Sequence, residues 1–186
     1  HMKILVCISS VPDTTSKINF TADKSAFDKN GIQWVINPYD EFALTKAVKL
    51  QESQGATVTI ATVGDAATEA VMRKALAIGA NDAIRVNAEP QDSITVAKEL
   101  AKIVEEGGYD LVFCGKESID YNGAAVPAMI AQLLNRPFVN ACVGLEVNGA
   151  EATVVREIEG GKETLTVKIP AVIAGQKGMV EEKDLI

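Results

Sequence analysis

The chain has 186 residues, 47% of them hydrophobic, which is enough to bury one full core. Its 18 basic and 25 acidic residues give a formal net charge of −7, which repels a phosphodiester backbone, so we expect no nucleic-acid partner. The single histidine, His1, stands in what looks like a cloning remnant, and this excludes catalysis by a Ser-His-Asp triad and a histidine-ligated metal centre. No apolar run approaches the roughly 18 residues of a membrane span, so we expect a soluble, intracellular protein without direct membrane insertion.

Strand and helix patterns alternate along residues 3–137. The residues after Asn37 show how such a helix begins: Asn37 can cap it, Pro38 fits its first position, and Asp40 suits the positive end of its dipole. Gly55 then marks the predicted end of this helix. The same reasoning predicts strands at 3–8, 56–63, 83–86 and 111–114, a loop at 11–15, a hairpin turn at Asn30-Gly31, and helices at 38–54, 66–78, 92–106 and up to Leu134. This order predicts an α/β fold with a doubly wound, mostly parallel sheet and right-handed crossovers.

The pattern changes after Pro137, where strands follow one another without helices. Turns at Asn148-Gly149 and Gly160-Gly161 separate strands at 143–147, 152–158 and 164–169, which predicts a β meander. One more strand is expected at 170–174. We therefore expect an α/β core at 3–137 that binds a nucleotide, a β meander at 138–178 that completes the same domain, and at 179–186 the start of a truncated C-terminal arm.

Three cysteines, Cys7, Cys114 and Cys142, lie far apart in the sequence among aliphatic neighbours. This pattern predicts buried thiols in strands and argues against a disulfide framework or a zinc site.

Three loops follow predicted parallel strands, and their placement suggests a ligand cleft. They span 7–14, 63–66 and 115–125, and the carboxyl ends of the strands in such a sheet are where ligands bind. The backbone N–H groups of residues 123–126, at a helix start, are the best phosphate donors. Asp120 could bind a ribose hydroxyl or an adenine amine, although a helix cap is the commoner role, and Lys116 could bind phosphate or remain a surface charge. Neither a P-loop nor a G-x-G-x-x-G motif is present, so plain connecting loops are an equally good interpretation.

Five segments, in this order, carry a resemblance to a known family: KILVCISSVPDTT, INPYDEFALTKAVKLQE, MRKALAIGANDAIRV, GKESIDYNGA and REIEGGKETLTVKIPAVI. Together they resemble the β subunit of electron transfer flavoprotein, over essentially all residues from Met2 to Ile186. The resemblance implies an adenine nucleotide alpha-hydrolase-like fold, a bacterial cytoplasmic location and no catalytic side chain, because a flavin carries the redox chemistry. It further implies a heterodimer with an α subunit, FAD shared with that subunit, AMP bound to the β subunit, and acyl-CoA or other flavin dehydrogenases as electron donors.

The same resemblance implies a set of ligand-contacting positions. Thr14 and Tyr39 would lie nearest the flavin held with the α subunit. The nucleotide contacts would be Cys7, Asn37, Pro38, Tyr39, Asp40, Val63, Gly115, Lys116, Glu117, Ser118, Ile119, Asp120, Tyr121, Asn122, Gly123, Ala124, Ala125 and Val126.

Two departures from the family pattern leave alternatives open. Many relatives have Asn-Gln-Thr-Gly where this chain has Ala-Ala-Val-Pro at 124–127, so a phosphate-binding hydroxyl is missing. The Val-Pro-Asp-Thr at 11–14 is more similar to the bifurcating branch of the family, whose β subunit holds a second FAD, although Ser9 replaces its usual lysine. A freestanding adenine-nucleotide sensor is the alternative from another class of protein.

Overall fold

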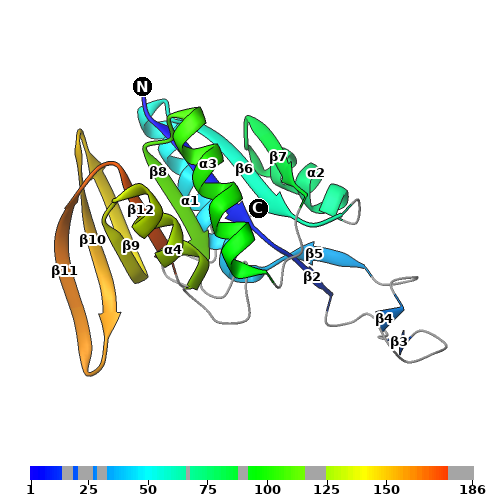
Figure 1. Cartoon of the computed structure of the whole chain (residues 1–186). Helices are drawn as coiled ribbons and strands as arrows, with labels where there is room; N and C mark the ends of the chain where they lie inside the picture. The colour runs from blue at the N-terminus through cyan, green and yellow to red at the C-terminus, as the bar shows by residue number, and fades with distance from the viewer. Residues whose placement is uncertain are drawn as a thin grey trace.

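The computed structural model describes residues 1–13, 19–20, 27–28, 33–65, 68–87, 92–115 and 125–175. Its main feature is an eight-stranded sheet of order β11-β10-β9-β12-β8-β1-β6-β7 (Figure 1). The strands of this sheet are β1 (Lys3–Ile8), β6 (Thr57–Val63), β7 (Asp82–Val86), β8 (Leu111–Gly115), β9 (Phe138–Asn148), β10 (Glu151–Ile158), β11 (Gly161–Lys168) and β12 (Ala171–Gly175). The helices in the described ranges are α1 (Pro38–Gln54), α2 (Glu69–Ile78), α3 (Ser93–Gly107) and α4 (Ala125–Leu134).

The strand pairings confirm the predicted doubly wound sheet. Every pairing from β9 through β12, β8, β1 and β6 to β7 is parallel, and β10 and β11 add to the β9 side as an antiparallel extension. From β1 the chain builds outward to β6 and β7, then crosses back to place β8 on the other side of β1. The order of the strands therefore reverses between β1 and β8, which is where open α/β sheets form a crevice at the carboxyl ends of the strands.

Helices cover both faces of the parallel strands. One apolar cluster joins α1 and α2 to side chains such as Ile4, Val6 and Ile60, and the other joins α3 and α4 to Leu5 and Val112. Because its alternate side chains enter different clusters, β1 is apolar from Ile4 to Ile8 without a polar alternation. A continuous apolar run of this kind is what a strand buried on both faces requires.

The predicted helix signals act as expected at α1. The Asn37 side chain accepts a hydrogen bond from the Tyr39 backbone N–H at 3.0 Å, and Pro38 is the first helical residue. At the other end, Gly55 adopts a left-handed conformation with φ of 72°, which a residue with a side chain rarely adopts. Asp92 caps α3 in the same way, by accepting from the Thr95 backbone N–H at 3.1 Å.

Several predicted boundaries differ from the structure. Residues 10–12, expected in a loop, form β2 (Ser10–Pro12), which pairs antiparallel with β5 (Trp34–Ile36). A second two-stranded pair joins β3 (Asn19–Phe20) and β4 (Phe27–Asp28). The helix expected from 66 is described from Glu69. The strand expected at 143–147 begins at Phe138. Its first part was not predicted because an irregularity in its pairing with β12 near Ala141, with φ of 56°, interrupts the side-chain alternation. The Asn30-Gly31 turn lies outside the described residues.

Within the described ranges, no helix is long and apolar enough to cross a membrane.

Two leucines on helices test the assignment of the core. Leu100 on α3 is completely buried, whereas Leu76 on α2 is 42% exposed. We expect Leu100→Ala to lower the free energy of unfolding by about 2–5 kcal/mol, because it removes buried methyl groups and leaves a cavity. Leu76→Ala serves as the matched control and should cost less than about 1 kcal/mol. Urea unfolding measures both, and equal losses would contradict the assignment.

Candidate functional site

The carboxyl ends of β1, β6 and β8 meet at one edge of the sheet. Cys7 of β1 is in register with Ala61 of β6 on one side and with Cys114 of β8 on the other. Val63 and Gly115, the last residues of β6 and β8, therefore lie beside the end of β1. The structure thus brings together the predicted site residues Cys7, Val63 and Gly115.

Asp40, in the first turn of α1, fills the crevice between β1 and β8. Its carboxylate accepts hydrogen bonds from the Ser9 backbone N–H at 2.8 Å, the Ser9 hydroxyl at 3.1 Å and the Gly115 backbone N–H at 3.1 Å. The residue is completely buried. Hydrogen bonds to a charged acceptor are about twice as strong as neutral ones, so this carboxylate ties two strand ends to the start of a helix.

A second bond attaches the start of α1 to the end of β1. The Asn37 backbone N–H donates to the Ser9 carbonyl at 3.0 Å, while the Asn37 side chain caps the helix. Ser9 is thus bonded through its N–H, its hydroxyl and its carbonyl to residues 37 and 40. Sequence reasoning missed Ser9 as a site residue, because its partners are about thirty positions away in the chain.

Gly115 is held against the same carboxylate. A methyl group added at this position would lie 2.4 Å from Asp40 Oδ1 and 2.7 Å from the Asp40 backbone nitrogen. No relaxation of a flexible side chain relieves the contact with the backbone nitrogen, so the close approach of β8 to α1 requires glycine here.

Tyr39 and the start of α4 present groups that a ligand could use. Tyr39 is 37% exposed, although its neighbour Asp40 is buried, so α1 offers an aromatic ring near this edge. Residues at a helix start have backbone N–H groups without partners in the helix, and α4 begins at Ala125 and Val126. The remaining predicted positions lie outside the described residues: Thr14, Lys116, Glu117, Ser118, Ile119, Asp120, Tyr121, Asn122, Gly123 and Ala124.

The three cysteines are buried free thiols, as the sequence predicts. The hydrogen bond with Cys7 and the burial of the site hold the pKa of the Cys114 thiol well above its usual range, and the nearby Asp40 adds to this. Burial raises the pKa of Cys142 to about 11, partly offset by a hydrogen bond with the Gly144 backbone and by the nearby charge of Lys46. Thiols in this state are poor nucleophiles.

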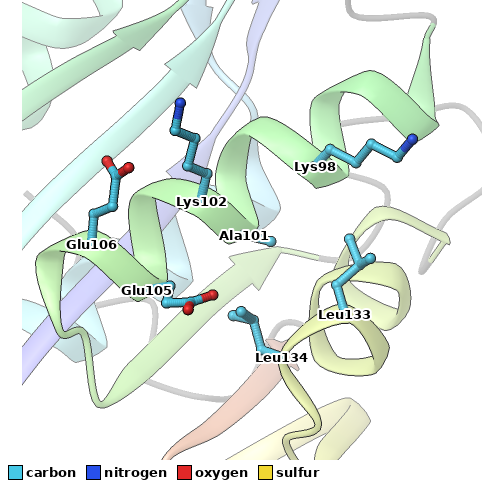
Figure 2. A pocket seen from close by; sticks show the side chains of 7 residues that line it. All are labelled: Lys98, Ala101, Lys102, Glu105, Glu106, Leu133 and Leu134. Atoms are coloured by element: carbon cyan, nitrogen blue, oxygen red, sulfur yellow. The ribbon is translucent and has the colours of Figure 1, made fainter.

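A groove between α3 and α4 is a separate candidate site. It has a volume of about 400 Å³, and Figure 2 shows its lining of Lys98, Ala101, Lys102, Glu105 and Glu106 from α3 and Leu133 and Leu134 from α4. An adjoining apolar hollow of about 310 Å³ includes Ile94 and Met129. Charges of both signs and exposed aliphatic groups line this groove. These side chains do not form a set of converging hydrogen-bond donors.

The strand order, the helices on both faces and the crevice at the point of reversal define a doubly wound α/β protein of the kind that binds ligands at its carboxyl edge. Residues 25–185 match the electron transfer flavoprotein domain. The chain is 32% identical to the electron transfer flavoprotein subunit beta of Bacillus subtilis over 98% of its own length and 72% of the relative. It is 36% identical to the mitochondrial electron transfer flavoprotein subunit beta of Oryza sativa subsp. japonica, over 92% of its own length and 70% of the relative.

A third relative, protein FixA of Azotobacter vinelandii, is 34% identical over 97% of this chain and 67% of the relative. The chain belongs to the electron transfer flavoprotein family and is a relative of its β subunits. The family resemblance expected from the sequence is therefore confirmed.

Gly115 offers a direct test of the contact between β8 and α1. We expect Gly115→Ala to lower the free energy of unfolding by about 2 kcal/mol or more, because the added methyl group meets backbone atoms of α1. Gly161→Ala is the matched control, since a methyl group there has no neighbour within 4 Å. Thermal and urea unfolding compare the two, and an equal effect would show that β8 and α1 are not in close contact.

The raised pKa of Cys142 predicts a loss of stability at alkaline pH. Its native pKa of about 11 lies above the unfolded value, so the stabilisation is complete below about pH 8.5 and is lost as the pH rises toward the native value. We expect the free energy of unfolding of the natural chain to fall more steeply than that of Cys142→Ala between these limits, by up to about 1.4 kcal/mol per pH unit. Urea unfolding at pH 8 and pH 10.5 measures both slopes, and identical slopes would refute the assignment.

Proposed function

We propose that this chain is the β subunit of a heterodimeric electron transfer flavoprotein. In this role it binds an adenine nucleotide at the carboxyl edge of its sheet and, with an α subunit, completes the surroundings of an FAD that receives electrons from flavin dehydrogenases. The observation that carries the proposal is the family membership over nearly the whole chain, together with the convergence of β1, β6, β8 and α1 at that edge.

The described part of the edge has the chemistry that a nucleotide needs. Backbone N–H groups at the start of α4 can donate to a phosphate without any particular side chain. Val63, at the end of β6, and Cys7 give this edge an apolar character that suits a planar base. An adenine nucleotide therefore fits the residues present, with its phosphate toward α4.

Tyr39 supports the proposed contact with the flavin of the partner. It is one of the few large hydrophobic side chains in the described ranges that are substantially exposed, and it follows the capped start of α1 at the same edge. Aromatic side chains of this kind are typical of interface cores, where they bury a large area at low entropic cost. The flavin, when bound, supplies the electron transfer, while the protein holds and shields it.

The start of α4 keeps two nucleotides as candidates within this function. Ala125 and Val126 provide no hydroxyl or charged group, so backbone donors alone would hold the phosphate. Such donors serve the single phosphate of AMP or the pyrophosphate of a second FAD. The second-FAD arrangement would make this chain the β subunit of a bifurcating electron transfer flavoprotein.

Purification of the chain alone and together with an α subunit tests the proposed function. We expect the isolated chain to be nearly colourless and the heterodimer to contain one FAD and one AMP, identified by mass spectrometry of the released ligands. Two FAD molecules per heterodimer would favour the bifurcating form. Failure to form a heterodimer, or ATP turnover by the isolated chain, would contradict the proposal and favour a freestanding nucleotide-binding protein.

A further inference from the structure

The crevice between β1 and β8 has the hydrogen-bond donors of an anion-binding site, which we call the anion seat. Two backbone N–H groups, those of Ser9 and Gly115, converge from adjacent strand ends on one point, and the Ser9 hydroxyl adds a third donor. The first turn of α1, with the positive end of a 17-residue helix, opens at the same point. Donors from two strands and a helix dipole that meet in this way are the usual elements of a phosphate site.

A carboxylate of the same chain occupies the anion seat. The carboxylate of Asp40 receives all three donors at 2.8–3.1 Å and is completely buried. The contact of Gly115 with Asp40 Oδ1 leaves no room for even a methyl group.

We propose that Asp40 is a specificity-determining residue that takes the place of a phosphate and excludes nucleotide phosphate from the crevice between β1 and β8. An incoming phosphate would find the donors of Ser9 and Gly115 engaged and a like charge at hydrogen-bond distance. A nucleotide bound at this edge must then place its phosphate elsewhere, toward the backbone of α4. The inference rests on the proposed nucleotide-binding function, and it specifies which part of the edge the phosphate cannot use.

This assignment differs from one in which the Asp40 side chain binds the nucleotide directly. A carboxylate that received a ribose hydroxyl or an adenine amine would need oxygen atoms accessible to the ligand. Here the oxygens face the backbone of two strands, in a side chain with no exposed surface. The segment Asn37–Asp40 can still contact a nucleotide through Tyr39 and its backbone.

Chemical rescue by a small carboxylate tests the seat on the whole chain. Asp40→Ala removes the internal anion and leaves the N–H groups of Ser9 and Gly115 without an acceptor, so its melting temperature should fall. Formate has the size and charge of the missing group. We expect about 0.5 M sodium formate to raise the melting temperature of Asp40→Ala by about 4 °C over the same concentration of sodium chloride, with no such difference for the natural chain.

Asp92→Ala is the matched control, because it also removes a carboxylate near the start of a helix, but one that is exposed to solvent. Formate should give this variant no selective stabilisation. Equal effects of formate and chloride on Asp40→Ala would overturn the assignment of the crevice as an anion seat.

A second measurement uses inorganic phosphate and needs no variant that could fail to fold. Titration of the natural chain, followed by amide NMR, should leave the resonances of Ser9 and Gly115 unchanged, because their N–H groups are already bonded. Phosphate-dependent shifts of both amides in the natural chain would overturn the exclusion. Neither result depends on whether the chain binds AMP or pairs with an α subunit, so failure of the inference and failure of the proposed function remain distinguishable.

Discussion

The contact between the Asp40 carboxylate and the ends of β1 and β8 is the constraint on which the candidate site depends. These two strands are neighbours, but the chain between them passes through α1, β6, α2, β7 and α3 before it returns. Without a group that bonds to both ends, the crevice at the point of reversal would expose the Ser9 and Gly115 N–H groups and require water or a ligand to satisfy them. The carboxylate satisfies both from within the chain and holds the end of β8 against α1.

The rest of the fold supports this contact by keeping β1 in the centre. Helices on both faces bury Ile4 to Ile8 almost completely, so β1 cannot shift its register without moving apolar side chains into the wrong cluster. The antiparallel strands β10 and β11 lie at the far end of the sheet in Figure 1, beyond the parallel strands that the helices cover. They extend the sheet without disturbing the edge where β1, β6 and β8 end.

Most of the helices were predictable because their signals are local. Contacts between residues far apart in the sequence were not predictable. Asn37, Pro38 and Gly55 act within a few residues of themselves, so the sequence reveals the limits of α1 directly. The partners of Asp40 are Ser9 and Gly115, 31 and 75 positions away, and no local pattern distinguishes this buried carboxylate from an ordinary acidic residue in a first helical turn. The position of β12 between β8 and β9 was hidden for the same reason, because β12 follows the meander in sequence but enters the sheet ahead of it. The irregularity near Ala141 also concealed the first part of β9, since the alternation of buried and exposed residues changes phase there.

The distribution of donors along the edge bears on which nucleotide can be held. With the N–H groups of Ser9 and Gly115 engaged by Asp40, the start of α4 still offers backbone donors for a phosphate. Pro127 has no N–H group, so the donors in the described part of that turn are Ala125 and Val126. Neutral backbone donors do not distinguish one phosphate from two by charge. Within the proposed function, the choice between AMP and a second FAD would therefore depend on the space beside the edge and on the α subunit, more than on any charged side chain in the described part of this chain.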